Sequence, residues 1–163
     1  MHRLHRPRDL TEELSKEIVD ALTIKDVVNA VYDDKIMTAI WNKALVNCCL
    51  NPLGAIKDMT GDLLCKDKES IDTMRCIAKE VEEVAKAYGI DNVSANNFFE
   101  KMLPNIANGP ANYPSMANDV HNKRKTEIDQ LNGFVMKLGK ELNIKTPCNE
   151  RIVMLVHAID NNY

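Results

Sequence analysis

The stretch that decides the fold class is WNKALVNCCLNPLGAI, residues 41–56. After Lys43 it contains no charged residue, so the segment is apolar on nearly every side. A helix of this kind lies in the middle of a domain, surrounded by other helices. We predict that it begins at Asp33 and runs to at least Asn51. Pro52 must then break or kink it, because proline has no amide hydrogen to donate.

The composition of the whole chain favours one domain built from helices. The chain has 163 residues, of which 45% are hydrophobic, 28% are charged and only 5% are aromatic. This balance is typical of a globular domain that is poor in sheet-forming residues. We therefore predict an all-α fold.

Charge and hydropathy bear on the class of partner. The formal net charge of -3 comes from interspersed signs, so no long basic face is available for a phosphate backbone. No run of about 18 to 20 apolar residues is present, and the first residues lack the apolar stretch of a signal peptide. We expect no nucleic acid and no membrane partner, and a cytoplasmic location by default.

Apolar residues at helical spacing predict further helices on both sides of the apolar stretch. Residues 24–31, which contain three valines, are the one candidate strand, and residues 108–114 are rich in turn formers. The predicted helices cover residues 9–22, residues 67–88 with Gly89 as the stop and an outer face of lysine and glutamate, residues 95–103, some 27 residues from 116 to 142, and a last helix after Pro147 that Asn149 caps.

The cysteines and histidines give no sign of a metal site. The five cysteines include an adjacent pair and no CxxC spacing, which fits neither a disulfide framework nor a thiolate site. We predict that they are buried, reduced thiols. The four histidines share no ligand spacing, so we predict that the chain has no metal site.

Three polar residues stand out on the apolar helix. Lys43, Asn47 and Asn51 are four residues apart, so they form one nearly straight row, about 12 Å long at 1.5 Å rise per residue. A solvated helix edge would explain such a row. Asparagines on an otherwise apolar helix must, however, find buried partners, since an unpaired buried amide costs about 1 to 3 kcal/mol. A ligand is one such partner, and another helix is the alternative.

A carboxylate and a hydroxyl are further candidates. Glu127 falls on the apolar stripe of the predicted long helix, where it either points toward the core side or reaches out to water or to a basic neighbour, Lys123 or Arg124. Ser115 follows the turn-rich loop, at a helix start, where its hydroxyl suits an anion or a plain N-cap.

These residues would serve the reduction of a carbonyl if they converged. A hydride that adds to a ketone leaves negative charge on oxygen, and this oxygen needs a proton donor. Lys43 is the candidate for that donor. Amides and a hydroxyl could hold the other oxygens of the substrate, and the carboxylate of Glu127 could fix a hydroxyl group or the lysine.

Three ordered motifs resemble a known family, the ketopantoate reductases. Residues 41–53, WNKALVNCCLNPL, are similar to its WxKLxxNxxxNPLTA segment. Residues 114–120, PSMANDV, and 124–133, RKTEIDQLNG, resemble its SMxQD and TEIDxLNG motifs, and residues 146–150, TPCNE, resemble its TPxN turn. Together the motifs extend the resemblance over about residues 27 to 160.

The resemblance implies a fold and an activity. The family reduces 2-dehydropantoate (ketopantoate) to pantoate with NADPH, and its helical C-terminal domain is of the 6-phosphogluconate dehydrogenase C-terminal-like type. By this resemblance Lys43 would be the general acid, and Glu127 would hydrogen-bond the substrate near the nicotinamide. Asn47 and Asn51 would bind substrate oxygens, and Ser115 would meet the substrate carboxylate.

The chain departs from the family in three conservative positions and in one large respect. Ala44, Asn118 and Gly54 stand where the family usually has Leu, Gln and Thr. No two of the six glycines are two residues apart, so there is no GxGxxG loop for a pyrophosphate. We therefore do not expect NADP to bind this chain tightly alone.

We expect residues 1–31 to be a remnant of a dinucleotide-binding domain, with a helix and a strand, or a disordered leader. Residues 32–163 would be the helical substrate-binding domain. The first hypothesis is thus a reductase half that is inactive without its N-terminal dinucleotide-binding domain, with a homodimer as an option. The second is a noncatalytic helical module for dimerisation or ligand binding.

Overall fold

The computed structural model of the protein describes residues 12–25, 27, 30–31, 33 and 35–162. Contacts along the chain divide it into two units, Met1–Ile36 and Met37–Tyr163. Among the described residues, no helix combines the length and the hydropathy that a bilayer crossing requires.

The first unit contains one helix, α1, among its described residues. It spans Glu12–Leu22, which confirms the predicted helix from Glu12 onward, whereas the predicted start at Asp9 lies outside the described residues. The strand predicted for residues 24–31 is wrong where the chain is described, since Ile24 forms an isolated bridge and Val27 lies in a turn. An extended segment without a neighbouring strand cannot complete a ladder of hydrogen bonds.

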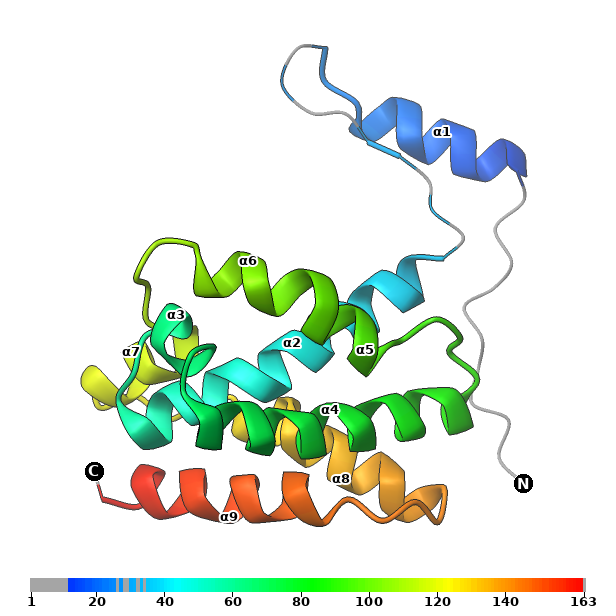
Figure 1. Ribbon diagram of the computed structural model, residues 1–163. Helices are drawn as coiled ribbons and strands as arrows, with labels where there is room; N and C mark the ends of the chain where they lie inside the picture. The colour runs from blue at the N-terminus through cyan, green and yellow to red at the C-terminus, as the bar shows by residue number, and fades with distance from the viewer. Residues whose placement is uncertain (1–11, 26, 28–29, 32, 34, 163) are drawn as a thin grey trace. The chain divides into compact units, whose positions relative to one another are not determined.

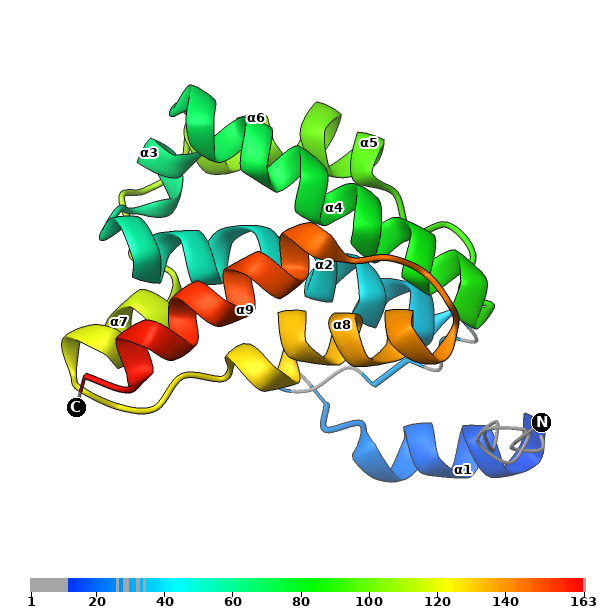
Figure 2. The ribbon, with the colours of Figure 1, turned by 90° about the horizontal axis from the view of Figure 1, so that it is seen from below.

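The second unit confirms the predicted all-α fold. Figure 1 shows α2 and α4 side by side in this unit, and Figure 2 shows α2 between α4 and α8. The elements are α2 (Ile36–Lys57), α3 (Gly61–Leu64), α4 (Lys68–Tyr88), α5 (Ala95–Asn97), the π-helical turn η1 (Phe98–Met102), α6 (Leu103–Ala107), α7 (Ser115–His121), the 3-10 turn η2 (Ile128–Gln130), α8 (Asn132–Glu141) and α9 (Pro147–Asp160).

The central helix α2 is buried along its second half, as its lack of charge predicts. Every residue from Cys48 to Ala55 is buried, and Trp41 and Leu45 join them in the core. Of the break or kink predicted at Pro52, the break is wrong, because α2 continues to Lys57. The chain tolerates this proline because the carbonyl that it leaves without a helical donor receives a hydrogen bond from another helix, as described below.

The helix α4 matches its prediction at both ends. The side chain of Asp67 caps its start by accepting a hydrogen bond from the amide of Ser70, and Gly89 ends it with a left-handed φ of 91°. The predicted outer face of lysine and glutamate is wrong at one position. Glu80 is only 7% exposed and points into the core.

The predicted long helix from residue 116 to 142 is wrong, since it is two helices, α7 and α8, with an irregular connection between them. No apolar residue occurs between Val120 and Ile128, so a continuous helix would have no stripe to bury there. Lys123 adopts a left-handed φ of 51°, which ends α7. The amide and the hydroxyl of Thr126 both donate to Asp160 of α9, which holds the connection.

Two helix ends also differ from prediction. The helix predicted for residues 95–103 continues through η1 and α6 to Ala107, because Pro104 lies in the first turn of α6, where a proline costs no hydrogen bond. The residue before α9 is Thr146, and Pro147 is its first residue. Asn149 is therefore not the cap but lies inside the helix, fully buried.

The prediction of five reduced thiols holds for three cysteines and is wrong for two. Cys48, Cys49 and Cys65 are buried and free, and burial raises the pKa of Cys48 to about 12 and that of Cys65 to about 11. Cys76 and Cys148 form a disulfide between α4 and the start of α9. They are 72 residues apart, and only the packing of these two helices brings their Cα atoms to 6.1 Å.

Candidate functional site

The row of polar residues lies on α2, and its burial increases along the helix. Lys43 is exposed, Asn47 is half-buried and Asn51 is buried, with 7% of its surface exposed. The three side chains share one face because they follow the helical period. The row therefore runs from the surface of the second unit into its core.

The buried end of the row meets α7. The side-chain amide of Asn51 donates a hydrogen bond of 3.0 Å to the hydroxyl oxygen of Ser115, which is 64 residues further along the chain. The plain N-cap interpretation of Ser115 is not observed, because Pro114 occupies the cap position and Ser115 is the first residue of α7. Two of the predicted site residues are thus in direct contact.

Gly54 of α2 lies against the ring of Pro114, the residue before Ser115. A Cβ atom at Gly54 would lie only 2.7 Å from Cγ of Pro114. A larger residue would therefore press on this ring, and the ring or α2 would have to shift. Gly54 is the position where the resembling family usually has Thr, so this departure leaves room for the close packing of Pro114.

A groove of about 430 Å³ opens beside Asn51. One acidic residue lies on it, Asp62, and the hydroxyl of Thr60 donates to this carboxylate and holds its pKa below the ordinary value. The groove otherwise offers amides, an aromatic ring and apolar surface. Its lining residues are Leu50, Asn51, Gly61, Asp62, Asn105, Ile106, Gly109, Pro110, Asn112, Tyr113 and Pro114.

The structure does not bring Lys43 and Glu127 into contact with this end. Glu127 is exposed and precedes η2, so the prediction that it points from a long helix toward the core is wrong. Its expected basic neighbour Arg124 pairs with Asp119 instead. Within the described residues, no hydrogen bond or ion pair is found for the side chain of Lys43 or of Glu127.

An apolar groove lies along the first half of α2. It has a volume of about 290 Å³ and is bounded by α2, α8 and the end of α4. Met37 and Ile40 are 39% and 51% exposed on its α2 side, and Phe134 is 48% exposed on α8. The ring of Phe134 lies 6.2 Å from that of the buried Trp41.

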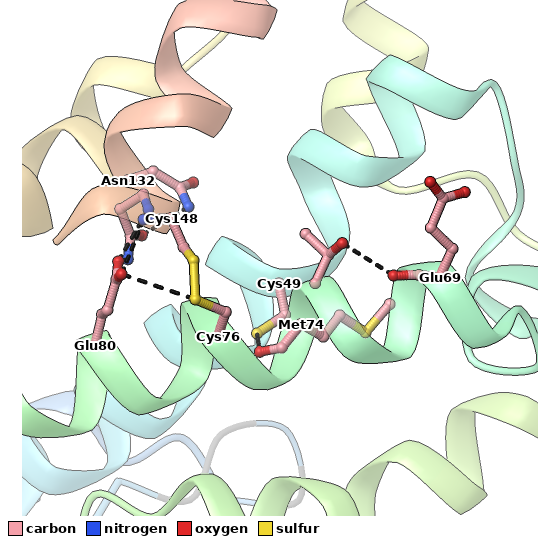
Figure 3. The surroundings of a disulfide bond; sticks show 9 residues. Cys49, Glu69, Met74, Cys76, Glu80, Asn132 and Cys148 are labelled. Carbon is pink, nitrogen blue, oxygen red and sulfur yellow. Dashed lines mark hydrogen bonds between the residues drawn. A yellow bond between two sulfur atoms is a disulfide. The ribbon is translucent and has the colours of Figure 1, made fainter.

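A buried polar network, not predicted from the sequence, joins α4, α8 and α9 (Figure 3) and reaches α2 at Cys48. Glu80 of α4 accepts hydrogen bonds from the backbone amides of Cys148 and Asn149 and from the side chain of Asn149. Asn132 of α8 donates to Asn149 and to the carbonyl of Cys48. Asn132 and Asn149 stand in the LNG and TPxN motifs, so the resemblance pointed to both positions without indicating a role for either.

Potential metal ligands come together at one place among the described residues. Cys76, Glu80 and Cys148 offer ligand atoms within 4.8 Å of one another, but the two sulfurs are joined as a disulfide. His121 and His157 make hydrogen bonds to Asp58 and Asp129. The chemistry available at the row is therefore that of amides, a hydroxyl and one exposed ammonium, which suits the oxygens of a small organic acid.

A comparison with protein families matches residues 35–160 to the model described as Ketopantoate reductase PanE/ApbA C terminal. A 2-dehydropantoate 2-reductase of Streptococcus pyogenes is 32% identical over 148 residues. That alignment covers 90% of this chain and 48% of the relative, so the chain spans about half the length of the curated relatives it matches.

Solved structures of two oxidoreductases superpose on this chain. A PanE/ApbA family ketopantoate reductase from Ralstonia eutropha superposes with a TM-score of 0.72 and 29% identity, covering 80% of this chain and 43% of that one. A D-mandelate dehydrogenase in a ternary structure with NADH and anilino(oxo)acetate superposes with a TM-score of 0.78 and 31% identity. It covers 94% of this chain and 64% of that one.

Proposed function

Because the chain belongs to the ketopantoate reductase family, as its C-terminal domain, we propose that it is the substrate-binding half of an NADPH-dependent 2-dehydropantoate 2-reductase. The observation that carries this proposal is the hydrogen bond between Asn51 and Ser115. It joins two of the family's motifs at the buried end of the row that also carries Lys43.

The candidate site residues would each contact a different part of a 2-keto acid. The hydroxyl of Ser115 can donate to the substrate carboxylate, since it accepts a hydrogen bond from Asn51 and keeps its own hydrogen free for a ligand. Asn47, one turn earlier on α2, can donate to the keto oxygen or to the hydroxyl of the substrate. Glu127 can accept a hydrogen bond from that hydroxyl.

Lys43 is the proposed proton donor. When a hydride adds to the keto carbon, the π electrons of the carbonyl move to oxygen, and the resulting alkoxide takes a proton from the ammonium group. Lys43 is exposed in this chain. We infer that a second domain covers it in the complete enzyme, which would exclude water from the reacting atoms.

The cofactor is not assigned to residues of this chain. NADPH would supply the hydride, and a dinucleotide-binding domain holds such a cofactor with a glycine-rich loop. The printed sequence has no two glycines spaced two apart. The proposal therefore leaves cofactor binding to the N-terminal domain of the complete enzyme and gives this chain binding, orientation and proton transfer.

A related 2-keto acid is the second candidate for the substrate. The similarity to a D-mandelate dehydrogenase structure favours it, because that protein was solved with a 2-oxo acid amide that carries an aromatic ring. A noncatalytic module for dimerisation or ligand binding is the alternative from another class, and the exposure of Lys43 and Glu127 is consistent with it.

An activity assay separates these functions. The chain is fused behind the N-terminal half of the Streptococcus pyogenes reductase, and NADPH oxidation is followed with ketopantoate and with phenylglyoxylate, the keto acid of mandelate. We expect turnover of ketopantoate by the fusion and none by the chain alone. Preference for phenylglyoxylate would support the second substrate, and a folded fusion without turnover of either acid would support the noncatalytic module.

Two lysine variants of the fusion test the proton donor. Lys43→Ala should lower kcat by a factor of about 100 or more, the usual contribution of a general acid. Lys79→Ala is the matched control, since Lys79 is an exposed lysine on α4 that pairs with Glu83. Equal kcat values for the two variants would contradict the role of Lys43.

A further inference from the structure

The proline inside α2 creates a specific problem for the backbone. In a continuous helix the amide of residue 52 would donate to the carbonyl of Cys48, four residues earlier. Pro52 has no amide hydrogen, and its ring pushes against that carbonyl. The turn concerned is buried, so water cannot replace the missing donor.

Asn132 supplies the missing donor. Its side-chain nitrogen lies 3.1 Å from the carbonyl oxygen of Cys48, and the side chain is completely buried. The two residues are 84 positions apart, on α8 and α2. The hydrogen bond that Pro52 removes from the helix is therefore replaced by one from a neighbouring helix.

The orientation of this amide is fixed by a chain of partners that ends at Glu80. The carboxylate can only accept, so Asn149 turns its nitrogen toward Glu80, at 2.7 Å. The oxygen of Asn149 then faces Asn132 and accepts from its nitrogen at 2.9 Å. The nitrogen of Asn132 therefore has one hydrogen for Asn149 and one for Cys48. The flipped orientation would set its oxygen against two acceptors.

We propose that Asn132 is a positioning residue that keeps α2 helical across Pro52. Cys48 lies between Asn47 and Asn51, so the carbonyl that Asn132 holds belongs to the turn that carries both amides. A helical turn keeps Asn51 in line with Asn47 and within reach of Ser115. The importance of this alignment for substrate binding rests on the proposed function, whereas the alignment itself does not.

A double-mutant cycle tests the proposal, because Pro52→Ala restores the amide that can donate to Cys48. Asn132→Leu should lower the thermal midpoint of the chain, and the loss should be smaller by about 4 °C in the Pro52→Ala background. The partner lost by Asn149 is the same in both backgrounds and cancels. Asn42→Leu is the matched control, since Asn42 donates to the carbonyls of Thr38 and Asn92 and should cost the same in both backgrounds.

The side-chain amide of Asn51 gives a readout that stability alone would not move. In spectra of asparagine-labelled chain, its resonance should shift in Asn132→Leu, as the contact with Ser115 is lost, and should return in the variant that also carries Pro52→Ala. Equal midpoint losses in the two backgrounds, or an unchanged Asn51 resonance in Asn132→Leu, would overturn the proposal.

Substrate binding then separates this proposal from the proposed function. The Kd for ketopantoate should increase in Asn132→Leu and recover with Pro52→Ala. If wild-type chain and fusion bind no ketopantoate, the proposed function fails, while the midpoints and the Asn51 resonance still decide whether Asn132 positions α2.

Discussion

The two ends of the polar row on α2 differ in how completely this chain surrounds them. At the end that we call the closed end, formed by Asn51, Gly54, Pro114 and Ser115, backbone and side chains are packed in contact. At the open end, formed by Met37, Ile40 and Lys43, the side chains of α2 are exposed. Along the same helix, this chain encloses one end of the row and leaves the other exposed.

This difference predicts which substitutions change the stability of the isolated chain. Next to the closed end, the network of Glu80, Asn132 and Asn149 holds the carbonyl of Cys48 in α2, and the disulfide joins α4 and α9 of that network. Substitutions there should change the stability of the isolated chain. Substitutions at the open end should leave its stability almost unchanged.

The largest effect is expected from the disulfide between Cys76 and Cys148. It closes a loop of 72 residues, which corresponds to about 4 kcal/mol of loop entropy removed from the unfolded chain. Urea unfolding with and without reductant measures this free energy. The double variant Cys76→Ser with Cys148→Ser is the control, because its midpoint should not respond to reductant. A wild-type urea midpoint that does not change with reductant would show that the disulfide does not stabilise the fold.

Gly54→Ala should have the next largest effect. The added methyl would press on Pro114, and overpacking of this kind costs about 1 to 3 kcal/mol. Gly61→Ala is the matched control, since a Cβ there meets Ile106 at 3.5 Å and the carbonyl oxygen of Asn112 at 3.7 Å, which are ordinary contacts. We expect a lower urea midpoint and a shifted Asn51 resonance for Gly54→Ala alone. Similar behaviour of the two variants would mean that the close approach to Pro114 is not needed.

A smaller effect concerns acid stability near the last turn of α2. The hydrogen bond from Lys57 and those from Ser70 lower the pKa of Asp67 to about 2. A carboxyl with a lower pKa in the folded state contributes stability that is present above its unfolded value, near 4, and is lost as the pH falls through about 2. Urea midpoints measured from pH 5 to pH 2 should therefore fall less steeply in Lys57→Met than in wild type. Parallel curves would contradict this assignment.

The smallest effect is expected at the open end. Ile40 is 51% exposed, so Ile40→Ser should change the free energy of unfolding of the isolated chain by less than about 0.5 kcal/mol. Leu45→Ala, one turn further on and buried, should cost about 2 to 5 kcal/mol. A large loss of unfolding free energy in Ile40→Ser would mean that the face of α2 that carries Ile40 is already packed against the chain.

Local patterns predicted those helices whose ends carry their own signals. Asp67 and Gly89 bound α4 as their residue types predict, and the uncharged half of α2 is the core. The sequence prediction missed the connection from residue 122 to 127. The apolar residues before and after this polar stretch keep the spacing of a single helix. The left-handed Lys123 and the bond from Thr126 to Asp160 break the helix in this polar stretch.

The sequence predicts candidate site residues, which stay predictions, but it does not predict the contacts that support them. The row on α2 and Ser115 follow from motifs, and the contact of Asn51 with Ser115 agrees with them. The partner of the Cys48 carbonyl could not be predicted, since Asn132 reaches it through packing between helices 84 residues apart. The disulfide could not be predicted for the same reason, since helix packing brings together cysteines that are 72 residues apart.

The most direct test of a preassembled half-site is a titration of the isolated chain with ketopantoate, followed through the side-chain amide resonances of Asn47 and Asn51. We predict saturable shifts of both, and none with pinacolone, a branched ketone without a carboxylate. Ser115→Ala should weaken the binding of ketopantoate. Unchanged Asn47 and Asn51 resonances at saturating ketopantoate, in a folded chain, would contradict the account.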